Sequence, residues 1–79
     1  MVNYSVTWVH IVGGDETNGP MNVSTETGQA SDETEKNSLI SADRFTLDPS
    51  DKLYRKEEIV DPAPTLPFDN TGWTDITPS

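Results

Sequence analysis

Chemistry that needs an activated side chain has few residues to draw on in this sequence. His10 is the only histidine and there is no cysteine, so the chain can form neither a histidine pair for a metal ion nor a thiolate nucleophile. His10 shares one face of its predicted strand with Trp8 and Val12, where we expect a partly buried, hydrogen-bonded histidine rather than a catalytic one. We therefore predict a protein that is not an enzyme and has no catalytic residue.

A glycine pair follows the first predicted strand, where a phosphate-binding loop would lie. Gly13 and Gly14 are not followed by the lysine and serine or threonine of such a loop, and no helix pattern begins after them. Asp15 and Glu16 come next, and their carboxylates would repel a phosphate. A turn is the better interpretation of this pair, and we expect no cofactor.

Two acidic segments carry oxygen-bearing side chains that could gather a hard cation. The segment 69–75 places them around Gly72, as a calcium loop does, but the bidentate glutamate that completes such a loop is missing. The other segment contains Asp32, Glu33 and Glu35. For both we predict a solvated acidic loop without a metal, and structural calcium is the alternative.

The net charge limits the kinds of partner. The chain has 14 acidic and 5 basic residues and a formal net charge of -9. Residues 1–35 contain six acids and no base, whereas residues 36–58 contain all five bases. Because nucleic-acid phosphates require clustered lysine and arginine, we expect no nucleic-acid partner.

The apolar content is low for a domain that folds alone. Leu, Ile, Val and Phe together number 16 of the 79 residues, which is close to the range of disordered chains. Disulfides and thiolate zinc sites, which stabilise many small domains, need cysteine. A partner's surface is therefore the remaining obvious source of apolar burial.

The clearest structural pattern is an alternation of apolar and polar residues from 2 to 12, which predicts a strand. From Val9 to Val12 both faces are mostly apolar, as expected for a strand covered on two sides. Glycine-containing turns follow, and alternation resumes over residues 21–27. We predict an antiparallel hairpin with a loop of five to seven residues.

The middle of the chain is harder to assign. Residues 28–37 lack large apolar side chains and predict an exposed loop, in which a helical turn could start at Ser31. We expect a strand over residues 43–47. Asp48 as a cap and Pro49 in the first turn predict one short helix over residues 49–59.

Prolines at 62, 64 and 67 predict an extended arm from residue 61 onward. The expected fold is thus mainly β, with a small α+β fold as the alternative: a β-rich body over residues 1–60 and an extended arm over residues 61–79. No apolar run is long enough to span a membrane, so we expect no membrane partner.

These features favour a structural subunit of a larger assembly, such as a cement, connector or tail-associated protein of a virus particle. Its partners would be other protein subunits of the assembly, with copies of itself as an open alternative, because edge strands and arms extend neighbouring sheets. The expected location is the virion, or otherwise the cytoplasm, because no secretion signal is present. The residues predicted to contact partners are Val9, Ile11, Leu66, Phe68, Trp73 and Ile76.

An acidic inhibitor or nucleic-acid mimic that blocks a basic site on a host protein is the second hypothesis. The uncompensated acids of residues 1–35 motivate it, because a carboxylate field steers a protein towards a positive cleft. Such a mimic would fold alone and bind less tightly as salt rises. A structural subunit would be poorly ordered alone and bind with little dependence on salt.

Overall fold

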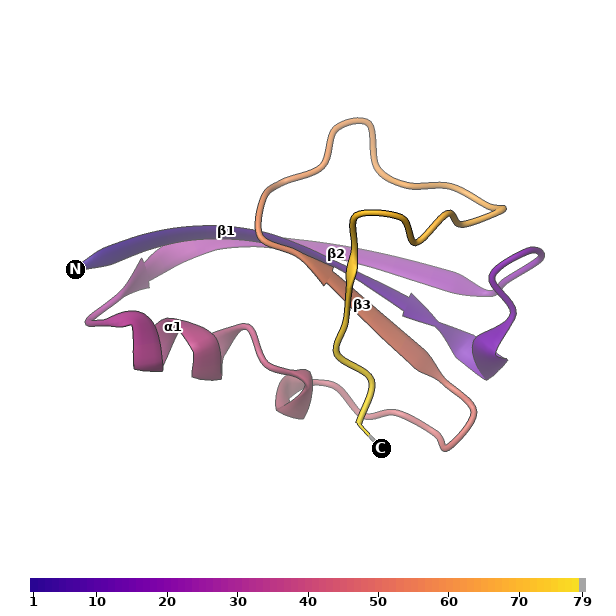
Figure 1. The fold of residues 1–79 in the computed structure, drawn as a ribbon, viewed down its shortest axis with the longest axis horizontal. Helices are drawn as coiled ribbons and strands as arrows, with labels where there is room; N and C mark the ends of the chain where they lie inside the picture. Colours follow the sequence, from indigo (N-terminus) through magenta and orange to yellow (C-terminus); the bar gives the residue numbers. More distant parts are fainter. Residues whose placement is uncertain (79) are drawn as a thin grey trace.

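The computed structural model describes residues 1–78, which form a four-stranded antiparallel sheet and one α-helix (Figure 1). The strands lie in the order β2-β1-β3-β4. Their bounds are Val2–Ile11 for β1, Met21–Ala30 for β2, Lys52–Lys56 for β3 and Thr74–Asp75 for β4. The helix α1 spans Glu33–Leu39. The predicted mainly β fold with an N-terminal antiparallel hairpin is confirmed.

The hairpin of β1 and β2 is longer than the sequence pattern suggested. Its register runs without a break from Val2 opposite Ala30 to Ile11 opposite Met21. Residues 28–30, predicted to begin a loop, therefore belong to the strand. The connection begins with Gly13 and Gly14, whose φ angles of 74° and 72° lie in the left-handed region that favours glycine.

The predicted helix over residues 49–59 is wrong, because the middle of this segment, Lys52–Lys56, forms β3. Leu53 and Tyr54 are both buried, at 0 % and 4 % exposure, but they lie in the cores on opposite faces of the sheet. Only a strand points neighbouring side chains to opposite faces. Pairing with β3 also gives hydrogen-bond partners to backbone groups of β1. These groups would lack partners if the segment formed a short, solvated helix instead.

The strand expected over residues 43–47 is also absent from the described structure, which has a 3-10 turn at Ala42–Arg44 instead. Arg44 and Phe45 both contact the ring of Trp8, with the guanidinium carbon 4.4 Å and the phenyl centroid 5.4 Å from its centroid. Consecutive residues of a strand point to opposite faces and could not both reach this ring. Packing on Trp8 therefore selects the turn.

The helical turn expected near Ser31 develops into α1. The Asp32 side chain caps the helix by accepting a hydrogen bond from the Glu35 backbone N–H at 2.8 Å. The Glu35 carboxylate in turn accepts hydrogen bonds from the backbone N–H and the hydroxyl of Ser31. Residues 33–37 are therefore helical, and not the loop that the lack of apolar residues predicted.

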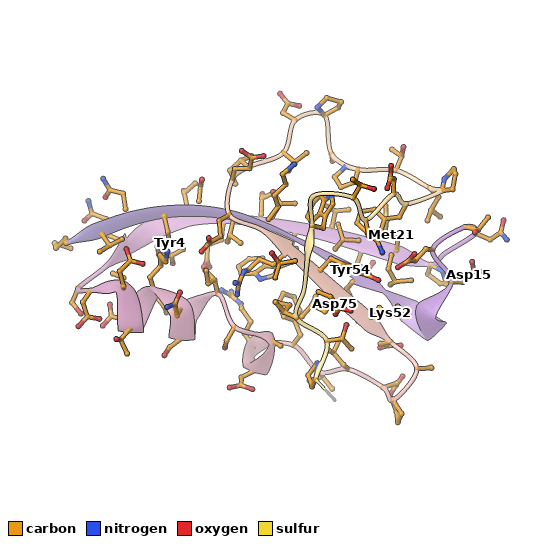
Figure 2. The ribbon with its side chains drawn as sticks, viewed as in Figure 1. Tyr4, Asp15, Met21, Lys52, Tyr54 and Asp75 are labelled. Carbon is orange, nitrogen blue, oxygen red and sulfur yellow. The ribbon has the colours of Figure 1, made fainter. Side chains whose placement is uncertain are left out.

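Each face of the sheet carries its own apolar core. Under α1 and the turn that follows it, Val6, Trp8, Ile40 and Leu53 form one cluster. On the other face, beneath the C-terminal arm, lies the cluster of Val9, Ile11, Tyr54 and Phe68. Figure 1 shows α1 and the C-terminal arm on different sides of the sheet, and Figure 2 labels Tyr4 near α1 and Tyr54 near the arm. The expectation that the first strand is covered on both sides is confirmed.

The arm crosses from one face of the sheet to the other. Phe68 is docked over Val9 and Ile11, and its backbone N–H donates to the Glu16 carbonyl at 2.6 Å. Further along, the Ile76 N–H donates to the Leu53 carbonyl at 3.0 Å, and the Ile76 side chain packs against the opposite core. The structure describes residues 61–78 of the predicted arm, and residue 79 lies outside the described residues.

Candidate protein-binding edge

The single histidine belongs to a hydrogen-bonded group around Asp51 that joins the end of β1, the turn after it and the turn before β3. His10 Nε2 lies 2.9 Å from Asp51 Oδ2, and the His10 side chain is 18 % exposed. Asp51 also accepts hydrogen bonds from the backbone N–H groups of Gly13 at 2.9 Å and Asp48 at 3.0 Å. The expected partly buried, hydrogen-bonded histidine is confirmed.

The partners of Asp51 also set its acidity. The hydrogen bond from Gly13, then those from His10 and Asp48, lower the pKa of Asp51 to about 2. Its carboxylate is buried and both oxygens already accept hydrogen bonds. The pair can therefore hold the end of β1 against the turn before β3, but it presents no free base to a substrate.

The acidic segments that resembled cation sites shape turns instead. The carboxylate of Asp69 accepts a hydrogen bond from the Thr71 N–H at 3.0 Å, and that of Asp75 does the same from Thr77 at 2.9 Å. Within residues 1–78, no group of three or more histidine, aspartate or glutamate side chains is arranged to hold a metal ion. No helix in the same part of the chain is long and apolar enough to cross a membrane.

Two hollows on the surface are open to solvent and differ in their lining residues, which are polar in the first and partly apolar in the second. One, about 630 Å³, lies beside α1 and includes Arg44, which donates to the Glu26 carboxylate and to the Leu39 carbonyl. A second, about 270 Å³, lies between the turn before β3 and the C-terminal segment, and Asp51 borders it. Arg44 and Asp51, charged side chains at these hollows, are already hydrogen-bonded to other parts of the chain.

The structure brings four of the six predicted contact residues together, inside the chain itself. Val9 and Ile11 are fully buried, Phe68 is 7 % exposed and Trp73 packs against the same cluster. The remaining two lie apart: Leu66 is exposed in the arm, and Ile76 packs on the opposite face of the sheet. A role in partner contacts stays a prediction for all six, and for Val9 and Ile11 it would require the arm to lift.

The free edge of β2 is a feature that the sequence reasoning missed. β2 pairs with β1 on one side and with no other strand of residues 1–78. The Val12 N–H donates to the Pro20 carbonyl at 3.0 Å, and these two residues lie directly opposite in the register of the hairpin. Opposite pairs alternate between hydrogen-bonded and not hydrogen-bonded, so the even-numbered residues of β2 bond to β1 and the odd-numbered residues do not. It follows that five residues direct both backbone groups away from β1: Met21, Val23, Thr25, Thr27 and Gln29.

This edge lacks the devices that usually protect an edge strand. Met21–Ala30 contains no lysine and no proline, and its register shows no bulge. Its one charged residue, Glu26, accepts hydrogen bonds from Arg44 at 2.8 and 3.2 Å, which lower the pKa of Glu26. The side chains of Thr25 and Thr27 are exposed. A run of ten residues with a single charge is the sequence feature that could have indicated an unprotected edge.

The opposite edge of the sheet is the two-residue strand β4, which covers the outer side of β3. At Leu53, the C=O accepts from the Ile76 N–H and the N–H donates to the Thr77 hydroxyl at 2.8 Å. Arg55 is paired with Thr74 of β4. Among the described residues, β2 therefore has the longest open side; residues 2–6 of β1, which β3 does not reach, form a shorter one.

No protein-family model matches this chain, and neither the curated proteins nor the solved structures searched include a match. The function has to be argued from the geometry of the chain.

Proposed function

We propose that this protein is a non-enzymatic structural subunit of a larger assembly, and that a neighbouring protein pairs a strand with β2. The observation that carries the proposal is the ten-residue edge strand, whose five outward residues have no backbone partner within residues 1–78. Protein sheets seldom leave such an edge free, because it is a template for another chain. Main-chain hydrogen bonds supply affinity in this mode of recognition.

The remaining polar groups fit a supporting role better than a catalytic one. The single histidine and the buried Asp51 hold loops together, and the hollow beside α1 is open and lined by polar residues. These features support the non-enzymatic part of the proposal. The placement of the assembly in a virus particle stays a prediction.

The acidic-inhibitor hypothesis has less support from the arrangement of charges. Glu26 pairs with Arg44, and Glu33 and Glu57 both lie within 3.3 Å of the Lys36 ammonium. Asp15 and Asp32 accept hydrogen bonds from nearby backbone N–H groups. A mimic of a nucleic acid would need its carboxylates free and in rows, whereas here they are engaged locally.

Hydrogen–deuterium exchange of single β2 amides tests the proposal. In the dilute isolated chain, the outward amides of odd-numbered residues such as Thr25 should exchange quickly, and the inward amides of even-numbered residues such as Ser24 slowly. In the native assembly the outward amides should slow by at least about tenfold, because they acquire backbone partners. Equally fast exchange in both states would contradict the proposal, and the inward amides serve as the internal control.

A further inference from the structure

We infer that the neighbour at β2 is a second copy of this chain, with two β2 strands antiparallel about a two-fold axis at Thr25. This inference rests on the proposed function and identifies its partner. The two four-stranded sheets would join into one continuous sheet across the axis.

The backbone geometry of β2 permits this pairing. With the axis at Thr25, each outward residue faces another outward residue: Val23 faces Thr27 of the second copy, and Met21 faces Gln29 of the second copy. Such pairs exchange both of their backbone hydrogen bonds, so the five pairs would make about ten hydrogen bonds between the copies. A register shifted by one residue would instead oppose outward groups to groups already bonded to β1.

The side chains are compatible in the same register. Thr25 faces Thr25 of the second copy, and Val23 faces Thr27 of the second copy. Both are favourable pairs of β-branched side chains. The Ser24 hydroxyl can donate to the Glu26 carboxylate of the second copy. No like charges lie directly opposite one another, and Glu26 is already paired with Arg44 within its own chain.

The short opposite edge, the two-residue strand β4, limits the assembly formed by this contact to two copies. Because Ile76 and Thr77 occupy the backbone groups of Leu53, a third copy finds no comparable edge on that side. A contact in which the same surface is used by both copies closes on itself. The contact therefore gives a dimer, which larger assemblies could use as their unit.

The net charge gives this dimer a characteristic salt dependence. Two chains of net charge -9 repel each other over long distances, whereas the interface itself carries only the internally paired Glu26. The Debye length falls from about 30 Å at 0.01 M salt to about 8 Å at 0.15 M. Added salt should therefore strengthen self-pairing, whereas it would weaken binding to a cationic partner strand.

Sedimentation equilibrium of the full chain tests the inference with two variants at one position. In Thr25→Pro the missing N–H points away from β1, so the intrachain ladder is kept while the edge is blocked. Thr25→Val keeps the N–H and is the matched control. We expect the wild-type chain to dimerise, with a dissociation constant that falls from 0.01 to 0.15 M salt. Thr25→Pro should raise this dissociation constant by about tenfold or more, and Thr25→Val should leave the dimer intact.

Single-amide exchange of the wild-type chain keeps the test decisive if Thr25→Pro disturbs folding. The outward β2 amides should become protected as the protein concentration rises, and the inward amides should not change. A monomer at every concentration and salt, or a dimer with unprotected outward amides, would overturn self-pairing. The proposed function would fail separately, if these amides also exchanged quickly in the native assembly.

Discussion

Phe68→Ala is the substitution that most directly tests how the arm is held on the sheet. Phe68 is 7 % exposed, and its ring centroid lies 5.4 Å from those of both Tyr54 and Trp73. It also packs against Val9 and Ile11 from β1. Removing the ring takes away two aromatic contacts and leaves a cavity between the arm and the sheet.

The expected loss is large for a chain of this size. Replacing a buried phenylalanine with alanine lowers the free energy of unfolding by about 3–5 kcal/mol in protein cores. A domain of 79 residues has a total free energy of unfolding of about 4–12 kcal/mol, at roughly 0.05–0.15 kcal/mol per residue. The alanine variant should therefore lose at least a quarter of its stability and could approach complete unfolding at 25 °C.

Urea unfolding, followed by circular dichroism and by tryptophan fluorescence, measures this loss. Phe68→Leu is the control, because it keeps an apolar side chain and loses mainly the aromatic pairing of about 0.5–1.5 kcal/mol per ring contact. If the arm detaches before the sheet unfolds, the part of the tryptophan fluorescence that comes from Trp73, and not from Trp8, should change at lower urea than the circular dichroism signal. A loss below about 1 kcal/mol for Phe68→Ala would refute the conclusion that this ring is a core residue.

Three further substitutions have defined outcomes. Thr7→Val should cost about 1–3 kcal/mol in urea unfolding, because the fully buried hydroxyl bonds to backbone groups of the segment 58–60, whereas Thr7→Ser should cost less. The pKa of Asp51 is lowered from 3.8 to about 2, so its contribution to stability is complete above about pH 4 and is lost as the pH falls through 2. The melting temperature should therefore change less with pH across this window in Asp51→Asn than in the wild-type chain. Gly28→Ala would place a methyl group 2.7 Å from the Tyr4 hydroxyl and should cost about 1–3 kcal/mol, a penalty that a prior Tyr4→Ala change should largely remove.

The sequence predicted the hairpin well because its pattern is local. Alternation over residues 2–12 and 21–27 identifies two strands, and the glycines between them provide the turn. The partly buried environment of His10 was predictable for the same reason, because it follows from the face of the strand that carries Trp8.

The error over residues 49–59 shows where local reasoning fails. Asp48, Pro49 and Asp51 have the chemistry of a helix start, and in isolation they favour one. In the structure, Asp51 binds Gly13 and His10, which precede it by 38 and 41 residues. These distant hydrogen bonds, with the pairing of β3 to β1, outweigh the weak helix preference of a short segment.

The strand-forming alternation, the acidic charge and the absence of thiol and paired-histidine chemistry follow from the order and types of the residues alone. Folding of distant segments onto one another places the arm over Val9 and Ile11. It also leaves β2 with an open edge, while Ile76 and Thr77 occupy the backbone groups of Leu53 in β3. The reason is physical: side-chain alternation and charge are properties of neighbouring residues. Which backbone groups stay unpaired depends instead on contacts between segments far apart in the chain.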